Sequence, residues 1–402
     1  MEPTTRSPRT SRASDPGQPR IPGRREFLIV VGGATAYAAL RPVDAWARRA
    51  RVNADAVALQ PWALPAEVPA AGFDLACALI GAAVLAPSDW NTQPWRFEVD
   101  PGSIRLHADT QRALPASDPD RRGLMVSLGA ALENLLVAAR AYGLQPTVRY
   151  AAADRTAVDA VAEVTWLEAG PRRDHELFDA LTERRTNRRN YDGRGLMPQI
   201  RAQLSAQVAD GPRLYWLDGR DALRELADLV HDAVRVSVSN RLFQAERHGW
   251  LRSSLQDAEL RGDGMPEDAL CMSGPANWFA GHYYDPKSWF LRLGAGSLAN
   301  RAREGVRSAG AVVLLTTTAR DESACLLGGQ AYERLALKAT QLGLAHQPIN
   351  APLELDRFRA PLLRQFGVTG EEPLMLVRCG HDGPVPHTPR RAVSVVATFR
   401  NS

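Results

Sequence analysis

Residues 127–143, SLGAALENLLVAARAYG, are the most informative stretch about the fold, because the chain carries a second version of them. Their apolar residues recur at intervals of three and four, which predicts one apolar face of a helix, with Ser127 as its N-cap and Gly143 as its stop. Residues 329–344, GQAYERLALKATQLGL, predict a second helix of the same kind. Over that length, at an offset of 200, seven of sixteen residues are shared: Gly129/Gly329, Ala131/Ala331, Glu133/Glu333, Leu135/Leu335, Ala139/Ala339, Gly143/Gly343 and Leu144/Leu344. Because this period far exceeds that of solenoid repeats, it predicts a duplicated domain.

The flanking segments fit two halves. Residues 147–151 and 158–166, after the first helix, predict strands from their β-branched and alternating residues. Residues 311–316, before the second helix, form an apolar run typical of a buried strand, and residues 374–378 predict another. We therefore expect three parts, a leader and two halves, with the bounds 1–47, 48–170 and 171–402.

The remaining segments are expected to connect or cover these halves. Shorter helices are predicted over residues 74–85 and 176–184, and residues 171–174 look like the join between the halves. Residues 240–305 match neither half and are rich in glycine, proline and aromatic residues. We therefore expect them to form an inserted, lid-like segment.

The composition is that of a folded globular protein, with 402 residues of which 45% are hydrophobic and 23% charged. No run approaches the roughly 18 apolar residues of a membrane span. The four cysteines lie far apart without a C-x-x-C pair, which argues against a zinc site or a disulfide scaffold, although one or two bridges stay open. Beyond residue 47, 42 basic residues face 41 acidic ones. So small a net charge gives no reason to expect nucleic acid or an anionic membrane as a partner.

The first 47 residues have the order of an export leader. The segment Gly23–Ile29, GRREFLI, holds an arginine pair followed by Phe-Leu, which is the twin-arginine pattern, and an apolar run extends to Leu40. Ala45-Trp46-Ala47 has the form of a cleavage site. We expect export to the periplasm or cell envelope, with the leader either cleaved or retained as an anchor; a basic tail before a buried helix is the alternative. Because this route carries folded proteins, it favours a protein that loads a cofactor before export.

One candidate binding segment is a polar bend near the start of the first half. Residues 86–97, APSDWNTQPWRF, follow the helix expected at 74–85 and lead into a strand. A Pro-Ser-x-x-Asn bend with Gln-Pro-Trp behind it brings together a hydroxyl, an amide and backbone donors, which suit a polar and partly aromatic ligand. As a bare pattern it also fits an ordinary polar turn.

A second candidate segment is a cluster of arginines. Residues 184–188, RRTNR, place three guanidinium groups beside a hydroxyl. The planar fork of arginine matches phosphate oxygens, so the cluster is a candidate phosphate site, although taken alone it fits a solvated basic face better. Arg390 and Arg391, near the C-terminus, are candidates to complete that site, and a loose basic tail is the alternative.

Together these segments resemble the nitroreductase family. APSDWNTQPWRF looks like its flavin-bordering loop, residues 183–191, ERRTNRRNY, look like its Arg-x-Ser/Thr-x-Lys/Arg element, and both repeat stretches look like its long central helix. The resemblance is closest to long, often twin-arginine-exported relatives that fuse two nitroreductase-like halves. It implies an α+β fold of two pseudo-symmetric halves, each a mixed sheet wrapped by helices, with FMN bound in the cleft between them.

The two motifs are divided between the halves. The first half has the loop but no Arg-x-Ser-x-Arg before it, since residues 53–73 contain no arginine or lysine. The second half has RRTNR but no second loop. The resemblance therefore implies one complete flavin site within one chain, one FMN per chain and no need for a homodimer.

The resemblance also assigns contacts to the arginine cluster. Arg184 and Thr186 would bind the FMN phosphate together with Arg390 or Arg391. Arg188 would approach N1 and O2 of the isoalloxazine ring, where a cation stabilises the anionic reduced flavin.

The remaining contacts implied by the resemblance come from two loops. Ser88 and Asn91 would contact the ribityl chain and the ring, within a loop whose cofactor-binding residues include Pro87 and Gln93. After the second repeat helix, the segment Pro348, Ile349 and Asn350 would place backbone donors near flavin N5, although family members commonly have an acid where Asn350 stands.

The implied function is ping-pong electron transfer from a reduced nicotinamide or another donor to a nitroaromatic or quinone-like acceptor. We expect no general acid or base, because in such a reaction the protein supplies position and charge rather than an acid–base residue. We expect no metal site, because Cys379, His381 and His387 lack a second ligand pair. The alternative is a protein that sequesters FMN beneath a lid. Residues 275–284 could stack over the ring, or they could simply pack the inserted loop against the core.

Overall fold

The computed structural model describes most of the chain beyond the expected leader: residues 62–151, 159–168, 170, 176–208, 211–252, 255–270 and 290–400. The leader at 1–47, the join at 171–174, Cys271 and the aromatic segment 275–284 lie outside the described residues.

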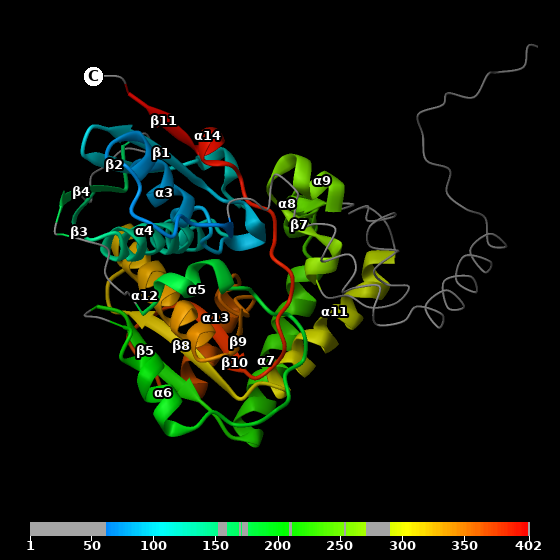
Figure 1. Ribbon diagram of the computed structural model, residues 1–402. Coiled ribbons are helices and arrows are strands. Elements are labelled where there is room, and N and C mark those ends of the chain that lie inside the picture. The colour runs from blue at the N-terminus through cyan, green and yellow to red at the C-terminus, as the bar shows by residue number, and fades with distance from the viewer. Residues whose placement is uncertain are drawn as a thin grey trace, which may run out of the picture. The chain divides into compact units, whose positions relative to one another are not determined.

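Two long helices, α4 (Arg122–Ala141) and α12 (Glu322–Gln341), form the centre of the structure and are the two halves of the sequence repeat. They pack against each other between two β-sheets (Figure 1). Gly143, which adopts φ 80° directly after α4, is the stop that the sequence predicted. The prediction of Ser127 as the N-cap is wrong, because α4 begins five residues earlier and the Ser127 hydroxyl donates to the Gly123 carbonyl within the helix (2.8 Å).

The early start of α4 has a local cause. The Asp118 carboxylate accepts hydrogen bonds from the backbone N–H groups of Gly123 (2.9 Å) and Leu124 (2.8 Å). These are among the first-turn amides that a helix leaves without a partner of its own. Asp321 plays the comparable part for α12, accepting from the Ala324 amide (2.7 Å) as a normal N-cap.

The two central helices approach most closely at the repeated glycines. A Cβ atom added to Gly129 would overlap the Leu326 carbonyl oxygen and lie 2.9 Å from the Cα of Gly329. A Cβ atom added to Gly329 would meet the Val126 carbonyl oxygen and the Cα of Gly129 in the same way. Only glycine allows two helix backbones this close, so the pair fixes the crossing about which the halves are related.

The first half consists of a five-stranded mixed sheet covered by α3 (Phe73–Ala83) and α4. The strand order is β11-β1-β2-β4-β3, and every pairing is antiparallel except β11 with β1. The strands after α4 that the sequence predicted are present with shifted ends. The bounds are β1 (Trp95–Asp100), β2 (Ser103–Ala108), β3 (Leu144–Tyr150), β4 (Ala162–Glu168) and β11 (Ala397–Phe399).

The second half consists of an antiparallel sheet in the order β5-β8-β10-β9. Alternate residues of β8 pack on opposite sides, Val313 against the α12 side and Val312 against the side of α7 (Arg220–Ser239), so the sheet is buried on both faces. This confirms the buried strand predicted at 311–316. The bounds are β5 (Arg213–Leu217), β8 (Ala311–Thr317), β9 (Ala345–Pro348) and β10 (Glu372–Gly380).

Further helices surround this second sheet. The amphipathic α7 packs against α11, and these two cover the face away from α12. The helix predicted at 176–184 is present as α5 (Phe178–Glu183). The other bounds are α6 (Pro198–Ser205), α7 (Arg220–Ser239), α11 (Phe290–Arg307) and α13 (Asp356–Gln365).

The inserted segment expected at 240–305 contains several short elements, and it also includes the N-terminal part of α11. Within the described residues it contains a two-stranded parallel ladder between β6 and β7. The bounds are α8 (Arg241–Trp250), β6 (Leu251–Arg252), α9 (Leu255–Arg261), β7 (Met265–Pro266) and η5 (Glu267–Leu270).

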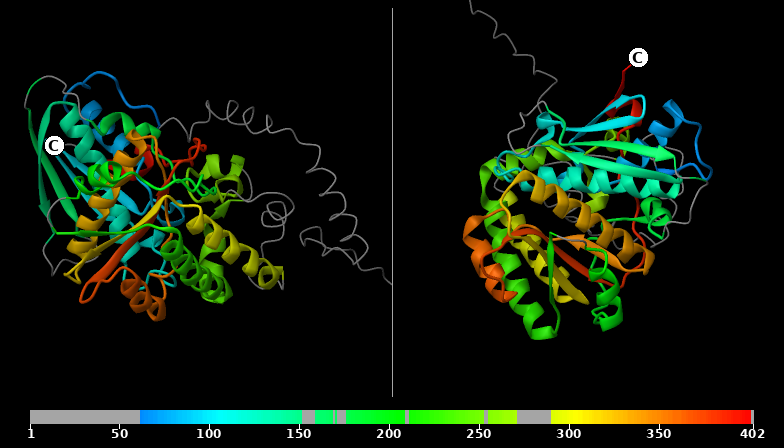
Figure 2. Two further views of the ribbon diagram at one scale, coloured as in Figure 1. Left: turned by 90° about the horizontal axis from the view of Figure 1, so that it is seen from below. Right: turned by 90° about the vertical axis from the view of Figure 1, so that its left-hand side faces the viewer.

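The C-terminal arm crosses from the second half to the first. After β10 the chain runs along the molecule to the short helix α14 (Val393–Val396) and then adds β11 in parallel beside β1 (Figures 1 and 2). The boundary expected from the sequence, which gives all residues to 402 to the second half, does not anticipate this crossing. Because of it, residues near 390 lie against the loop that follows α3.

Among the described helices, α4 is the one long and apolar enough to cross a membrane, and 94% of its apolar window is buried inside the protein. It is therefore accounted for as a core helix. Cys77, Cys325 and Cys379 are free thiols.

Candidate active site

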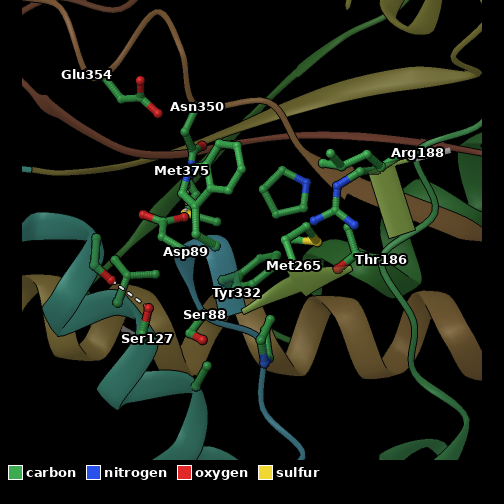
Figure 3. Close-up of a pocket in the computed structure, with 17 residues that line it drawn as sticks. Ser88, Asp89, Ser127, Thr186, Arg188, Met265, Tyr332, Asn350, Glu354 and Met375 are labelled. Atoms are coloured by element: carbon green, nitrogen blue, oxygen red, sulfur yellow. Dashed lines mark hydrogen bonds between the residues drawn. The ribbon is translucent and has the colours of Figure 1, made fainter. Parts of the chain in front are cut away.

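A cavity of about 200 Å³ lies between the halves. Its walls come from the loop after α3, the N-terminal half of α4, Tyr332 of α12, and segments of the second half. The lining residues are Pro87, Ser88, Asp89, Trp90, Gly123, Val126, Ser127, Ala130, Thr186, Arg188, Met265, Leu270, Tyr332, Pro348, Asn350, Glu354 and Met375. Figure 3 shows Asp89 and Glu354 on the opposite side of the cavity from Arg188 and Thr186, so its two ends differ in charge.

The loop after α3 has a strained backbone. Trp90, Asn91 and Gln93 adopt φ values of 52°, 53° and 51°, in the left-handed region that non-glycine residues avoid. Each such residue costs on the order of 1–2 kcal/mol, and such strain concentrates at functional sites, where surrounding contacts hold it in place.

The side chains of Asn91 and Gln93 supply those contacts. Asn91 Nδ2 donates to the carbonyls of Gly264 (2.9 Å) and Pro389 (3.0 Å). Gln93 Nε2 donates to the Gly262 carbonyl (2.7 Å), and its Oε1 accepts from the Arg391 amide (2.9 Å). Both side chains are buried and therefore hold the loop against the inserted segment and the C-terminal arm, rather than lining the cavity.

Two arginines from distant parts of the chain meet beneath this loop. Arg184 and Arg390 both donate to the carbonyl oxygen of Leu85, at 3.1 and 3.2 Å, and both are almost fully buried. Arg184 also forms an ion pair with Glu333 (Nε–Oε1 3.3 Å), while Arg390 donates to the Asn91 side chain (3.0 Å). The repeat residue Glu333 thus sits beside the two cations.

The charges of this cluster are not balanced. Burial raises the pKa of Glu333 to about 7, against the opposing effect of Arg184 and Arg390. Burial and the neighbouring Arg184 lower the pKa of Arg390. Within the described residues, Arg184 Nη1 and Arg390 Nε have no hydrogen-bond partner. Two buried guanidinium groups against one carboxyl therefore leave positive charge and N–H donors that an anion would satisfy.

Thr186 and Arg188 continue from this cluster into the cavity. Thr186 forms a parallel β-bridge with His346, which carries the chain along the edge of the second sheet. Arg188 lines the cavity and its Nη1 donates to the Ala269 carbonyl (3.3 Å). Within residues 184–188, Arg184 therefore lies in the buried cluster and Arg188 lies in the cavity wall.

The segment after β9 forms another wall. Pro348 and Asn350 line the cavity, whereas the Ile349 side chain packs into the core on the far side of the sheet. The Ile349 amide donates to the Leu376 carbonyl (2.8 Å), and the Asn350 side chain accepts from the Leu376 amide (3.0 Å). The wall is thus anchored to β10.

The other end of the cavity is acidic. Asp89 follows Ser88 in the strained loop, and Glu354 approaches from the second half, where it accepts from Arg247 Nη2 (2.6 Å). Burial raises the pKa of Asp89 to about 7, and the negative charges of Asp118 and Glu354 add to the effect, opposed by Arg122 and Arg247.

The structure brings together about half of the residues predicted from sequence as cofactor ligands. Those in the cavity wall are Pro87, Ser88, Thr186, Arg188, Pro348 and Asn350. Those outside the wall are Arg184, Asn91, Gln93, Ile349, Arg390 and Arg391. Because the residues of the second group do not line the cavity, their roles in cofactor binding stay predictions.

Sequence reasoning missed several residues of the wall. Asp89 and Trp90 stand inside the quoted loop but were not singled out. Tyr332 is a repeat position where the first half has Leu132, so a comparison of the two halves for differences would have marked it. Glu354, Met265 and Met375 carried no sequence signal. In the described part of the chain no cluster of histidine, cysteine and acidic side chains could hold a metal ion.

The chain matches no family model. A Mycobacterium tuberculosis protein named "Putative NAD(P)H nitroreductase Rv3131" is 30% identical over 321 residues, which cover 79% of this chain and 89% of that protein. This chain belongs to the nitroreductase family. A second M. tuberculosis relative, "Putative NAD(P)H nitroreductase acg", is 26% identical over 345 residues, covering 81% of this chain and 96% of that one. Family membership agrees with the fused two-half fold seen here.

Solved structures of nitroreductases are similar to part of the chain. The FMN-dependent nitroreductase NfnB from Mycobacterium smegmatis, in complex with NADPH, is 17% identical, with a TM-score of 0.35 and coverage of 56% of this chain and 98% of that one. A nitroreductase-like structure from Anabaena variabilis is 12% identical, with a TM-score of 0.40 and coverage of 70% of this chain and 69% of that one.

Proposed function

We propose that this nitroreductase-family protein is an FMN-dependent oxidoreductase that takes electrons from a reduced nicotinamide or another donor and passes them to a nitroaromatic or quinone-like acceptor. The observation that carries the proposal is the cavity between the halves, whose walls combine the loop of one half with the arginine segment of the other. The family membership and the names of the relatives support it.

The residues present fit FMN at its phosphate end. The buried pair Arg184 and Arg390 holds more positive charge than Glu333 balances, and some of its N–H donors have no partner among the residues that the structure describes. A phosphate monoester carries between one and two negative charges near neutral pH and accepts bidentate hydrogen bonds from arginine. Thr186, two residues from Arg184, would add a hydroxyl donor, and Arg391 would stay with Gln93, to whose backbone it donates (3.2 Å).

The cavity residues fit the rest of the cofactor. Bound FMN would supply reversible hydride and electron transfer, which no side chain of the chain provides. Arg188 would stabilise negative charge on the reduced ring, Ser88 would face the ribityl chain, and the backbone from Pro348 to Asn350 would border the ring edge. Asn91 and Gln93 would contribute indirectly, by holding the loop in its position.

The cavity is smaller than the roughly 300–1,000 Å³ typical of sites for ligands of this size. Side chains around it must therefore shift to admit the whole cofactor. Trp90, Tyr332, Met265 and Met375 give it apolar walls, which exclude water from the reacting atoms and strengthen electrostatic contacts inside.

An anaerobic titration of the purified full-length protein with NADPH, followed by visible absorbance, tests the function. A yellow protein whose oxidised-flavin band bleaches supports the reductase. A yellow protein that bleaches with dithionite and not with NADPH points to a different donor or to FMN sequestration, the alternative raised by the inserted segment. A colourless protein that takes up no added FMN contradicts the proposal.

We further propose export by the twin-arginine route, which rests on the sequence of residues 1–47 alone. A reporter fused behind these residues should reach the periplasm in cells with an intact twin-arginine translocase. Replacement of Arg24 and Arg25 by lysine should keep the reporter in the cytoplasm.

A further inference from the structure

Asp89 occupies an unusual place in the cavity wall. It is held in the strained loop between Ser88 and Trp90, and its Oδ2 lies so close to Gly123 that a Cβ atom there would overlap it. Gly123 belongs to the first turn of α4, so the carboxyl group of the loop rests directly on the start of the central helix. The side chain stays partly accessible through the cavity although protein surrounds it.

The charged side chains around Asp89 form hydrogen bonds to other partners, whereas the Asp89 carboxyl forms none within the described residues. Asp118 binds the amides of Gly123 and Leu124, and Glu354 binds Arg247 (2.6 Å). Arg122, the other nearby cation, donates to the Leu353 carbonyl (3.1 Å). Within the described residues, no hydrogen bond or ion pair reaches the Asp89 carboxyl.

This environment favours a protonated carboxyl group. In the described part of the chain no hydrogen-bond donor stabilises the charge of Asp89, and two acidic neighbours, Asp118 and Glu354, face it. Burial with these neighbours raises its pKa to about 7, even though Arg122 and Arg247 act in the opposite direction. A carboxyl group with a pKa near the working pH both holds a proton and releases it readily, which is what a general acid requires.

The proposed reaction needs such a proton. A quinone becomes a hydroquinone by gaining two electrons and two protons. A hydride carries both electrons and one proton, so the second proton must reach the acceptor oxygen separately. A nitro group likewise takes up protons as one N–O bond breaks and water leaves.

In contrast to the expectation from the sequence that the site has no general acid, we propose that Asp89 is the proton donor to the acceptor bound in this cavity. The inference rests on the proposed function, in which reduced FMN supplies the hydride. The Asp89 O–H bond breaks, an O–H bond forms on the acceptor oxygen, and Asp89 is left as a carboxylate. After the product has left, the Asp89 carboxylate takes up a proton from bulk solvent, which restores the carboxyl group.

Tyr332 is the rival donor in the cavity wall, because its hydroxyl is buried and has no hydrogen-bond partner within the described residues. Burial raises the pKa of Tyr332 far above its ordinary value. So weak an acid transfers a proton poorly at neutral pH. Asp89 lies in the cavity wall with no hydrogen bond or ion pair to its carboxyl within the described residues, so it is the better-placed donor.

The test separates proton transfer from electron transfer. Full-length protein is reduced with one equivalent of dithionite and mixed anaerobically with menadione, which takes up protons, or with ferricyanide, which takes up an electron alone. Asp89→Asn should slow menadione reduction about 100-fold, the size of a general-acid contribution. It should leave ferricyanide reduction and the Kd for FMN within twofold. Asp120→Asn, which removes an exposed acid paired with Arg359 (2.9 Å), is the control and should match the wild type.

The pH dependence and an infrared titration give independent readings. Wild-type menadione reduction should fall above pH 7, and Asp89→Asn should lose that inflection. A protonated-carboxyl band that titrates near pH 7 should be present in the wild type and absent in Asp89→Asn.

Equal menadione rates and pH profiles in wild type and variant would overturn the proposal, as would loss of the rate in Tyr332→Phe alone. A wild-type protein that reduces ferricyanide but not menadione overturns the donor role and leaves the redox function intact. A protein that retains no FMN overturns the proposed function, and the donor role with it.

Discussion

Gly129 and Gly329 lie backbone to backbone where α4 crosses α12, and a Cβ atom on either one would lie 2.9 Å from the Cα of the other. They are 200 positions apart and correspond in the sequence repeat. The contact therefore joins equivalent points of the two halves and fixes the distance between the elements that wall the cavity.

Alanine at either glycine should destabilise the fold. The added methyl group would press on a carbonyl oxygen and a Cα atom of the opposite helix, which are backbone atoms that cannot rotate away. We expect Gly129→Ala and Gly329→Ala each to lower the free energy of unfolding by about 2–3 kcal/mol, as overpacked cores do. Gly296→Ala in α11, where the new methyl group meets open space, is the control and should be neutral or stabilising. Denaturant titration measures all three, and equal values would contradict the close crossing.

Removal of the cavity arginine should weaken FMN binding. Arg188→Ala removes the cation placed in the wall, and loss of one charged hydrogen bond costs about 1.5–3 kcal/mol, so the Kd should rise roughly 10- to 100-fold. Arg189→Ala is the control, because Arg189 points to the Pro384 carbonyl (2.9 Å) outside the wall. Fluorescence titration with FMN gives both values. Unchanged FMN retention in a folded Arg184→Ala, Arg188→Ala double variant would contradict the site assignment.

The buried Glu333 should make stability depend on pH. Its pKa is about 7 in the fold and lies near 4.5 when exposed, so the unfolded chain releases the proton first. Its contribution is then complete below pH 4.5 and is lost as the pH rises through 7, a total on the order of 3 kcal/mol. Urea unfolding of the apoprotein between pH 4.5 and 8 should show this decline, and Glu333→Gln should flatten it. A decline of equal size in the variant would exclude Glu333 as its source.

Glu354 should raise the pKa of the proton donor from the same end of the cavity. Its negative charge raises the pKa of Asp89, so Glu354→Gln should move the inflection in menadione reduction to lower pH. The glutamine amide can still accept from Arg247, which keeps the local geometry while the charge is removed. A shift to higher pH would contradict this electrostatic coupling.

The protein should bind one FMN per chain. The repeat predicts a second, pseudo-symmetric place for a flavin. There, Gln330 of α12 occupies the position that corresponds to Ala130 of α4, which lines the cavity. Its side chain donates to Glu133 (2.9 Å) and accepts from Tyr150 (2.9 Å), which fills the corresponding space. The ratio of flavin absorbance to protein in a sample saturated with FMN should be one, and a value near two would show that the second place is open.

The two central helices and the division of the motifs between two halves could be predicted from the sequence alone. Apolar periodicity marks α4 and α12, and Gly129 and Gly329 are matched positions of the repeat. The residues of 86–97 and 184–188 lie within short segments, so their residue types could be recognised without coordinates.

Which of these side chains face the cavity depends on how distant segments of the chain pack together. Arg184 and Arg188 look alike in the sequence, yet one is buried against Glu333 and the other lines the wall, because the chain bridges to β9 between them. The acidity of Asp89 depends on Asp118, Glu354, Arg122 and Arg247, which approach from three other segments of the chain. Electrostatic energy depends on separation in space and on burial, and neither is encoded in the local pattern of residues.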